Sequence, residues 1–388
     1  MTNERVYLDW NATTPLRAEA RAAMAAALEL AGNPSSIHAE GRAARGLVEQ
    51  ARAAVADAVG AAARDVVFTS GGTEAITLAL TPGLRIGPQP VERLVVSAIE
   101  HAAVLSGGRF APAQIEVVEV TREGVLDLDH LRRLLADGPP AMVSLMLANN
   151  ETGALQPIEQ ASEIVHAAGG VLHVDAVQAL GKVPFRIKGL GSDLMSLSAH
   201  KLGGPKGVGA LVLGADIQGL DPLLRGGGQE LGRRAGTENV AGIVGFGAAV
   251  AATMPTLVDD MARVEKLRNR LEANLRQTED SVIVCESVAR LPNTTLFAVP
   301  GLRAETAVIG FDLAGVAVSS GSACSSGKVQ PSHVLQAMGF GPELAKSAIR
   351  ISLGWSSSES DIEACLKAWK KLAGNLTKRD HETVLERF

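Results

Sequence analysis

Short, continuously apolar segments alternate with longer amphipathic ones over the first half of the chain, and this pattern constrains the fold most strongly. Strands buried on both faces of a parallel sheet are apolar throughout, whereas half-exposed strands alternate. Six segments fit the buried type: Val66–Thr69, Leu94–Ser97, Ile115–Val118, Met142–Leu145, Val171–Val174 and Leu194–Leu197. Residues 18–30 and 41–59 mix charged and apolar residues as amphipathic helices do. The chain is therefore predicted to be an α/β sandwich.

The pattern changes after Pro255. A long charged helix is predicted over residues 259–278, followed by strands over residues 281–285 and 294–298. The chain has 388 residues, 46% of them hydrophobic, which is enough for two or three domains. We place a domain change near residue 257, and we expect function at the loops that follow the carboxyl ends of the first group of strands.

Composition argues against several classes of partner. The net charge is −5, whereas a nucleic-acid-binding protein normally has a basic surplus. The N-terminus lacks a signal-peptide pattern, and the apolar stretch 240–254 is shorter than the ~20 residues that span a bilayer. We interpret that stretch as a buried helix and expect no membrane partner. Cys285, Cys324 and Cys365 form no metal-ligand grouping, and their odd number suits a reducing, cytoplasmic location.

A lysine follows the last of the apolar segments. The run Ser198-Ala199-His200-Lys201 leads into a loop rich in glycine and proline. Lysine can form a Schiff base with a carbonyl group when its amine is partly desolvated and its pKa is lowered. A lone lysine in a loop is more often only solvated, so this run needs support from others.

That support comes from an acid at the end of the preceding apolar segment. Asp175 lies in the run His173-Val174-Asp175-Ala176-Val177-Gln178. A carboxylate there could pair with a pyridinium nitrogen and keep it protonated, although a helix N-cap is the simpler interpretation. His173 and Asp175 have no third ligand nearby in the sequence, so we predict no metal site.

Two further runs have the composition of functional loops. Residues 69–74, Thr-Ser-Gly-Gly-Thr-Glu, join a strand to a helix that is expected to begin near Ala75. Small residues and a helix N-terminus suit a phosphate, although the glycines could simply form a tight turn. Residues 319–327, Ser-Ser-Gly-Ser-Ala-Cys-Ser-Ser-Gly, place Cys324 in a loop without bulky neighbours. Cys285 and Cys365 instead have the apolar surroundings of inert core cysteines.

Together these runs resemble the NifS/IscS branch of the cysteine desulfurases, within the fold-type I enzymes that use pyridoxal 5'-phosphate (PLP). The resemblance extends over essentially all 388 residues. Besides the runs above, it rests on residues 7–15 (YLDWNATTP), 32–36 (GNPSS), 100–101 (EH), 149–153 (NNETG), 234–237 (RAGT), 331–333 (PSH) and 349–352 (IRIS). The order of so many motifs makes a chance likeness very improbable.

The resemblance implies a large PLP-binding domain over residues 15–257, with a mostly parallel seven-stranded sheet in an α/β/α sandwich. Residues 1–14 and 258–388 would form a smaller α+β domain with the cysteine loop at about 319–330. Within the first domain, Lys201 would bond PLP and Asp175 would pair with the pyridine nitrogen. Gln178 would reach the phenolic oxygen, while His101 would stack on the ring and move protons.

The remaining roles implied by the resemblance concern the phosphate, the substrate and the sulfur. The cofactor phosphate would lie among Gly72, Thr73, Ser198 and His200, and Thr237 would reach the phosphate of a neighbouring subunit, which implies a homodimer.

Asn150 and Arg350 match the substrate-binding positions, and Cys324 matches the cysteine that forms a persulfide. The simpler interpretations of Asn150 and Arg350 are a turn asparagine and a surface ion pair. The usual interpretation of a lone cysteine, an inert core residue, does not fit Cys324, because nothing around it would bury it. The implied reaction takes sulfur from L-cysteine, leaves L-alanine and passes the sulfur to an iron–sulfur scaffold or another acceptor protein. A selenocysteine lyase, an aminotransferase and a PLP-fold scaffold without activity remain alternatives.

The chain departs from the family pattern at a few positions. Ala199 stands where many relatives have glycine, and Gly72 where many have alanine; we expect little effect from either. By the resemblance, we expect the C-terminal segment 382–388 to be shorter than the tail that IscS-type members use to engage their scaffold, which leaves the acceptor protein open. The long loop around Cys324 favours this branch over the SufS branch.

Overall fold

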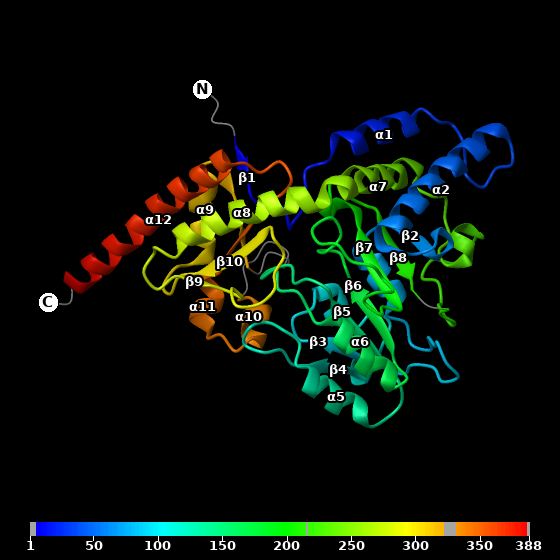
Figure 1. Ribbon diagram of the computed structural model, residues 1–388, viewed down its shortest axis with the longest axis horizontal. Coiled ribbons are helices and arrows are strands. Elements are labelled where there is room, and N and C mark those ends of the chain that lie inside the picture. Colours follow the sequence, from blue (N-terminus) through cyan, green and yellow to red (C-terminus); the bar gives the residue numbers. More distant parts are fainter. Residues whose placement is uncertain (1–4, 215, 322–330, 386–388) are drawn as a thin grey trace.

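The structure is a computed structural model that describes residues 5–214, 216–321 and 331–385, with side chains described up to residue 374. The strands of these residues form three sheets (Figure 1). The strands are β1 (Val6–Tyr7), β2 (Val66–Thr69), β3 (Arg93–Ser97), β4 (Ile115–Val118), β5 (Ala141–Met146), β6 (Val171–Asp175), β7 (Leu194–Ser198), β8 (Gly209–Leu213), β9 (Val282–Ile283), β10 (Thr294–Ala298), β11 (Val316–Ala317), β12 (Ser319–Ser320) and β13 (Ile349–Ser352).

The largest sheet has seven strands in the order β2-β8-β7-β6-β5-β3-β4. All neighbouring pairs are parallel except those of β8, which runs antiparallel to both β2 and β7. The predicted fold class is thus confirmed, and all six predicted strands belong to this sheet. The sequence prediction missed β8, because its apolar residues directly follow a loop of glycine, proline and lysine that we interpreted as a single irregular segment.

Helices pack against these sheets. They are α1 (Ala18–Leu28), α2 (Ala39–Val59), α3 (Gly72–Ala79), α4 (Ala102–Leu105), α5 (Leu128–Ala136), α6 (Ile158–Ala167), α7 (Val240–Thr253), α8 (Leu257–Leu275), α9 (Ala304–Leu313), α10 (His333–Ala337), α11 (Pro342–Ser347) and α12 (Glu359–Leu385). On the seven-stranded sheet, α7 packs between α1 and α2, while α5 and α6 pack together beside β4, β5 and β6 (Figure 1). The buried strand residues therefore lie between helical layers, as their unbroken apolar pattern predicts.

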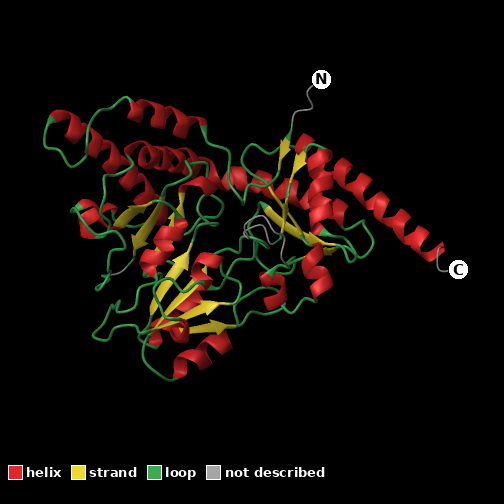
Figure 2. Cartoon of the chain, turned by 180° about the vertical axis from the view of Figure 1, so that it is seen from behind, coloured by secondary structure: helices red, strands yellow, loops and turns green. Residues whose placement is uncertain are grey.

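A second group of strands lies apart from the first (Figure 2). It consists of the antiparallel sheet β12-β13-β10-β9 and the parallel pair β1–β11. Helices α8, α9 and α12 enclose a core against it, with Phe297, Phe311 and Trp369 at its centre. The N-terminal strand β1 joins this group although the residues after it contact the first sheet. The domain division predicted at residue 257 stays a prediction; α8 begins at that residue.

The helical run 240–275 contains α7, a short 3₁₀ turn at Met254–Thr256 and α8. By length and composition it could cross a membrane, but half of its most apolar window is buried inside the protein. The glycines of α7 pack tightly, because a Cβ at Gly247 would lie 2.6 Å from Ala51 Cα of α2. The interpretation of residues 240–254 as a buried helix agrees with this packing.

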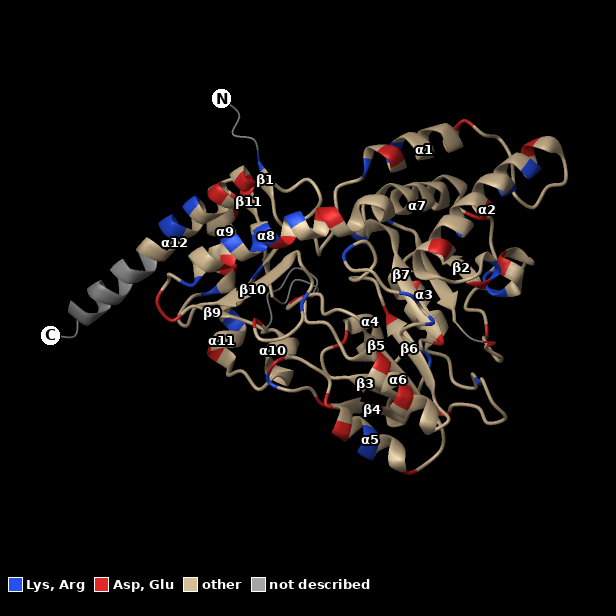
Figure 3. Cartoon of the chain, viewed as in Figure 1, with Lys and Arg blue, Asp and Glu red and all other residues tan. Residues whose placement is uncertain are grey.

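Charged residues of both signs are interspersed along the outer helices (Figure 3). On α8, for example, Asp259 and Asp260 lie in the first turn, where the helix dipole favours negative charge. Further along, Arg270 forms ion pairs with Glu359 and Glu363 of α12. These exposed pairs contribute little stability individually.

Among the glycines that the structure describes, Gly354 is the one at which an added Cβ would approach a neighbouring atom most closely. A Cβ there would lie 1.9 Å from Cε3 of Trp10, whose buried ring packs edge-on against Trp355. We therefore expect Gly354→Ala to lower the free energy of unfolding by about 1–3 kcal/mol, the usual cost of overpacking, measured by urea denaturation. The matched control is Gly46→Ala, a helical glycine with no heavy atom within 4 Å of the added Cβ, which should be neutral or stabilising. Equal changes in the free energy of unfolding for both substitutions would contradict the conclusion that Gly354 is tightly packed.

Candidate active site

A cavity of about 300 Å³ lies where β5, β6 and β7 end, beside the start of α3. Its walls come from segments that are far apart in the sequence, including the N-terminal segment and β13. The lining residues are Asn11, Ala12, Gly72, Thr73, Ile76, His101, Met146, Ala148, Asn150, Asp175, Val177, Gln178, Ser198, His200, Lys201 and Arg350. All the sequence-predicted site residues except Thr237 and Cys324 are among them. The carboxyl ends of the parallel strands therefore form this site, as in other open α/β sheets.

Lys201 reaches the cavity from a 3₁₀ turn, Ala199–Lys201, that directly follows β7. Its Nζ donates to two backbone oxygens of the N-terminal segment, at 2.6 Å from Asn11 O and 2.8 Å from Ala12 O. The side chain is half-buried, so the amine is partly desolvated. The turn thus presents a lysine against a carbonyl-lined wall.

Asp175 is the last residue of β6 and is buried. Its Oδ1 accepts the backbone N–H of Val177 at 2.9 Å. Burial raises the pKa of Asp175, and the positive charges of His101 and Lys201 act in the opposite direction. The carboxylate therefore depends on nearby cations, or on a cationic ligand, to remain ionised.

His101 is the N-cap of α4 and lines the cavity. Other titratable side chains lie near its ring. His101 Nδ1 accepts the Ala103 N–H at 3.1 Å, so a neutral ring would have its proton on Nε2. The neighbouring Glu100 is fully buried; its Oε1 accepts the Met146 N–H at 2.8 Å, and its Oε2 has no hydrogen-bond partner among the described residues. Burial raises the pKa of Glu100 well above its usual range. Sequence reasoning identified His101 but not this buried acid.

Arg350 enters the cavity from β13 and is 2% exposed. Its Nη1 donates to Asn150 O at 2.9 Å and its Nη2 to Asp9 Oδ1 at 2.7 Å. Its Nε has no hydrogen-bond partner within the described part of the chain. The guanidinium is therefore a buried charge that pairs with Asp9 at the cavity wall, not the surface ion pair of the simpler interpretation.

The start of α3 forms one end of the cavity. A Cβ at Gly72 would lie 2.9 Å from Val177 Cγ2 and 3.5 Å from Ser198 Cβ, so glycine is matched to its neighbours here. The expectation that exchange with alanine would matter little stays a prediction, since the close contact is with the end of the Val177 side chain. His200 lies nearby, with its Nδ1 at 3.1 Å from Thr13 Oγ1. Burial, followed by the charges of the nearby lysines, lowers the pKa of His200 to about 4, so its ring is neutral at pH 7.

Sequence reasoning missed the two residues that connect this site internally, Asn11 and Lys182. The backbone oxygen of Asn11 accepts Lys201 Nζ and also Gln178 Nε2, the latter at 2.9 Å. Its Oδ1 accepts the buried Lys182 Nζ at 2.9 Å. Asn11 lies within the recognised run 7–15, whereas Lys182 lies four residues beyond the run that ends at Gln178 and carries no motif signal. Their partners lie too far away in the sequence to be identified from spacing.

Two predicted site residues lie outside this cavity. Thr237 lines a separate hollow of about 180 Å³ together with Ser70 and Arg234. Cys324 lies outside the described residues, so its role stays a prediction. The other cysteines are buried and free. Burial raises the pKa of Cys285 to about 11 and that of Cys365 to about 12, which makes both thiols unreactive.

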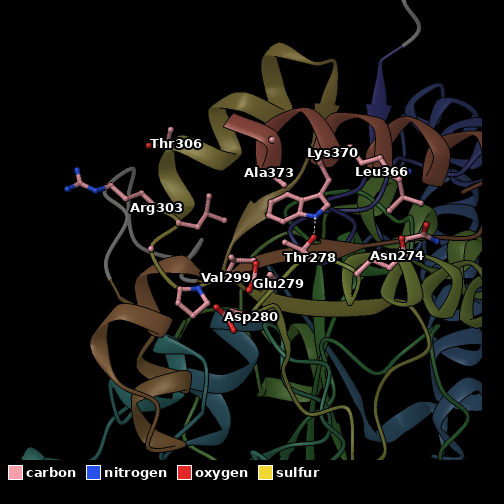
Figure 4. Close-up of a pocket in the computed structure, with 16 residues that line it drawn as sticks. Asn274, Thr278, Glu279, Asp280, Val299, Arg303, Thr306, Leu366, Lys370 and Ala373 are labelled. Carbon is pink, nitrogen blue, oxygen red and sulfur yellow. Dashed lines mark hydrogen bonds between the residues drawn. The ribbon is translucent and has the colours of Figure 1, made fainter. Parts of the chain in front are cut away.

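A larger hollow of about 630 Å³ lies within the second group of strands and helices. The end of α8, the segment before α9 and the helix α12 surround it (Figure 4). On its wall, Trp369 Nε1 donates to Thr278 Oγ1 at 2.9 Å. None of the predicted site residues lines it, so we do not place the site there.

The chain matches the family described as aminotransferase class-V over residues 6–365. A cysteine desulfurase of Cereibacter sphaeroides is 44% identical over 380 residues, which cover 96% of this chain and 97% of that protein. Among solved structures, a NifS-like protein from Rickettsia africae has 39% identity and a TM-score of 0.86, covering 95% of this chain and 99% of that one. A structure described as SspA in complex with cysteine has 27% identity and a TM-score of 0.74, covering 91% and 100%.

Fold and cavity thus define a fold-type I α/β enzyme scaffold with its site at the strand ends. The chain belongs to the aminotransferase class-V family. The NifS-like solved structure and the curated relatives support the branch that the sequence motifs indicated.

Glu151 is a buried acid beside Arg350. We expect the protonation of Glu151 to change the free energy of unfolding. Its Oε2 accepts the Ser332 hydroxyl at 2.5 Å, and burial raises its pKa to about 7. Between pH 4.5, the ordinary value, and pH 7 the folded protein therefore binds more protons than the unfolded one, and the free energy of unfolding falls as pH rises.

In the wild type we expect the free energy of unfolding to fall by up to about 3 kcal/mol across this pH window, and in Glu151→Gln we expect this fall to be absent. Urea denaturation at pH 5, 6, 7 and 8 would measure it. Glu163→Gln on α6, an exposed position, is the matched control and should leave the pH profile unchanged. A Glu151→Gln profile parallel to that of the wild type would contradict the assignment.

Proposed function

We propose that this protein is a PLP-dependent cysteine desulfurase that converts L-cysteine to L-alanine and transfers the sulfur to Cys324. The observation that carries the proposal is the convergence of Lys201, Asp175, His101 and Arg350 on one cavity at the strand ends. The cysteine desulfurase names of the relatives and the cysteine-bound SspA structure support the same substrate.

The chemistry of the cavity fits PLP. Lys201 and Arg350 contribute positive charge to the cavity wall, which suits a ligand with phosphate and carboxylate groups. The absence of a Cβ at Gly72 leaves room beside Ser198, and the first N–H groups of α3 favour an anion. Bound there, PLP would supply an electron sink for negative charge developing at the substrate Cα.

Four residues would hold the ring of the cofactor. Asp175 would keep the pyridine nitrogen protonated, and that cation would in turn favour the ionised form of a carboxylate whose pKa burial raises. Gln178 would donate its amide to the phenolic oxygen, and His101 would cover the ring face. Lys201 would form the covalent bond to the cofactor through Nζ.

The phosphate would lie at the start of α3. Thr73, Ser198 and His200 line that part of the cavity with Gly72. His200 is neutral at pH 7 and can act as a hydrogen-bond donor without adding charge. Thr237, which lies outside the cavity of its own chain, would contact the phosphate of a second subunit, and the protein would therefore be a homodimer.

The substrate would be bound from the opposite side by Arg350 and Asn150. Arg350 would bind the carboxylate of L-cysteine through its guanidinium. The Lys201 amine would take the proton from Cα, and His101 would take the proton of the substrate thiol.

Sulfur transfer requires a nucleophile, and we assign it to Cys324. The Cys324 thiolate attacks the substrate sulfur, so that an S–S bond forms while the Cβ–S bond breaks. Cβ then gains a proton and the product is L-alanine. The substrate carbon is reduced and the Cys324 sulfur is oxidised to a persulfide, so no external oxidant is needed. The persulfide would pass to an iron–sulfur scaffold or another sulfur acceptor in the cytoplasm.

Lys201→Ala tests the cofactor bond. We expect the variant to lose the visible absorption of lysine-bound PLP, because no other amine of the cavity wall can replace Nζ without rearrangement. The measurement is an absorption spectrum after reconstitution with PLP. Lys206→Ala, an exposed lysine of the same loop, is the control and should keep the band. An unchanged band in Lys201→Ala would contradict the lysine assignment.

A single turnover with L-cysteine tests the reaction. PLP-loaded protein is mixed with L-cysteine without reductant, followed by peptide mass spectrometry and quantification of alanine. We expect one added sulfur on the Cys324 peptide, matched by alanine, and loss of both in Cys324→Ser but not in Cys365→Ser. Sulfur on Cys285 or Cys365 would overturn the Cys324 assignment. Amino transfer to a 2-oxo acid without alanine formation from cysteine would favour an aminotransferase instead.

A further inference from the structure

Lys182 is a buried lysine that the reaction above does not use. It lies in the turn that follows β6 and is 5% exposed. Successive backbone bonds, from Leu180 N to Ala176 O and from Lys182 N to Ala179 O, give this turn a helical form. Gln178 and Lys182 are four residues apart and therefore lie on the same side of it.

The Lys182 amine binds two side-chain oxygens. Nζ donates to Asn11 Oδ1 at 2.9 Å and to Gln178 Oε1 at short range. Because ammonium and amine groups donate, the oxygen of the Gln178 carboxamide is fixed on the Lys182 side. The Gln178 Nε2 consequently faces the other way, where one of its hydrogens binds Asn11 O at 2.9 Å. The second hydrogen of Nε2 is left for a ligand in the cavity that Gln178 lines.

The charge of Lys182 has no direct counterion among the described residues. No carboxylate there forms an ion pair with it, and a buried lone charge is costly. Burial, and then the charges of Lys201 and Arg350, lower the pKa of Lys182 well below its usual range. A neutral amine has two N–H bonds, which match the two acceptors. The positive form would become favourable once an anionic ligand enters the cavity.

We propose that Lys182 is a positioning residue for the cofactor: it fixes the Gln178 amide so that Nε2 points to the phenolic oxygen of PLP. This inference rests on the proposed function and extends it to a residue that does not line the cavity itself. An apolar side chain at position 182 would fill the same space at a lower desolvation cost. The lysine is therefore explained by what it does to Gln178 and Asn11.

The inference predicts a spectroscopic change. A hydrogen bond donated to the phenolic oxygen disfavours protonation of the lysine–PLP bond. Replacing Lys182 by methionine, which has a similar length and no donor, releases the Gln178 amide from its fixed orientation and weakens that hydrogen bond. We expect the pH midpoint of the visible band in Lys182→Met to rise by about one pH unit, a tenfold increase in proton affinity. Fluorescence titration of the apoprotein should also show weaker PLP binding.

A double-mutant cycle separates positioning from a general effect on the fold. Gln178→Met should raise the midpoint to a similar extent, and adding Lys182→Met to it should change the midpoint little further. Lys188→Met, an exposed lysine later in the same segment, is the matched control and should behave as wild type. Should Lys182→Met not fold, Lys182→Leu, which also lacks a donor, gives the same test.

The outcomes distinguish this inference from the proposed function. Wild-type protein that gains no visible band with PLP overturns both. A wild-type band with an unshifted midpoint in the Lys182 variants overturns only the role of Lys182. The double mutant could instead show a midpoint shift equal to the sum of the two single shifts. Lys182 would then act independently of Gln178, which would also overturn the positioning role.

Discussion

The site depends on one asparagine whose hydrogen-bonding groups are all engaged. The backbone oxygen of Asn11 accepts from Lys201 and Gln178, and its side chain binds Lys182. Three further contacts reach the second group of strands or the residue before it: Ser352 Oγ, Asn293 Nδ2 and Thr294 Oγ1, at 3.0, 3.1 and 2.9 Å. Asn11 Nδ2 also donates to Asn150 O at 3.3 Å. A buried amide with every group paired is rigid and costly to disrupt. Asn11 therefore fixes the backbone wall that binds Lys201 relative to the seven-stranded sheet and to the second group of strands.

Charge gives the cavity its chemical character. Lys201 and Arg350 lie around a small volume, while burial opposes the ionisation of Asp175, Glu100 and Lys182. Such an arrangement is unfavourable for folding in isolation and favourable for a ligand with several negative groups. The residues that lower the stability of the fold thus also favour the binding of anionic ligands.

Much of the fold could be predicted from the sequence because its signals are local. The limits of β2, β4 and β10 agree with the prediction to the residue, since short apolar runs between polar loops define buried strands. β8 was missed because its glycine-rich approach resembles a continuing loop. The motifs identified Lys201 and Asp175 individually. Lys182 and Glu100 could not be found in that way, because their roles arise from contacts between segments far apart in the chain.

The helical run 240–275 has a mechanical consequence. α7 is held by α1 and α2, whereas α8 packs against β10 and α12. The two helices meet at the 3₁₀ turn Met254–Thr256, where Pro255 removes a backbone donor and interrupts the α-helical pattern. Together they connect the seven-stranded sheet to the second group of strands through that turn. A rotation of the second group of strands relative to the seven-stranded sheet would therefore change the backbone at this turn and at Asn11. The orientation of the two groups is thus coupled to the position of the wall that binds Lys201.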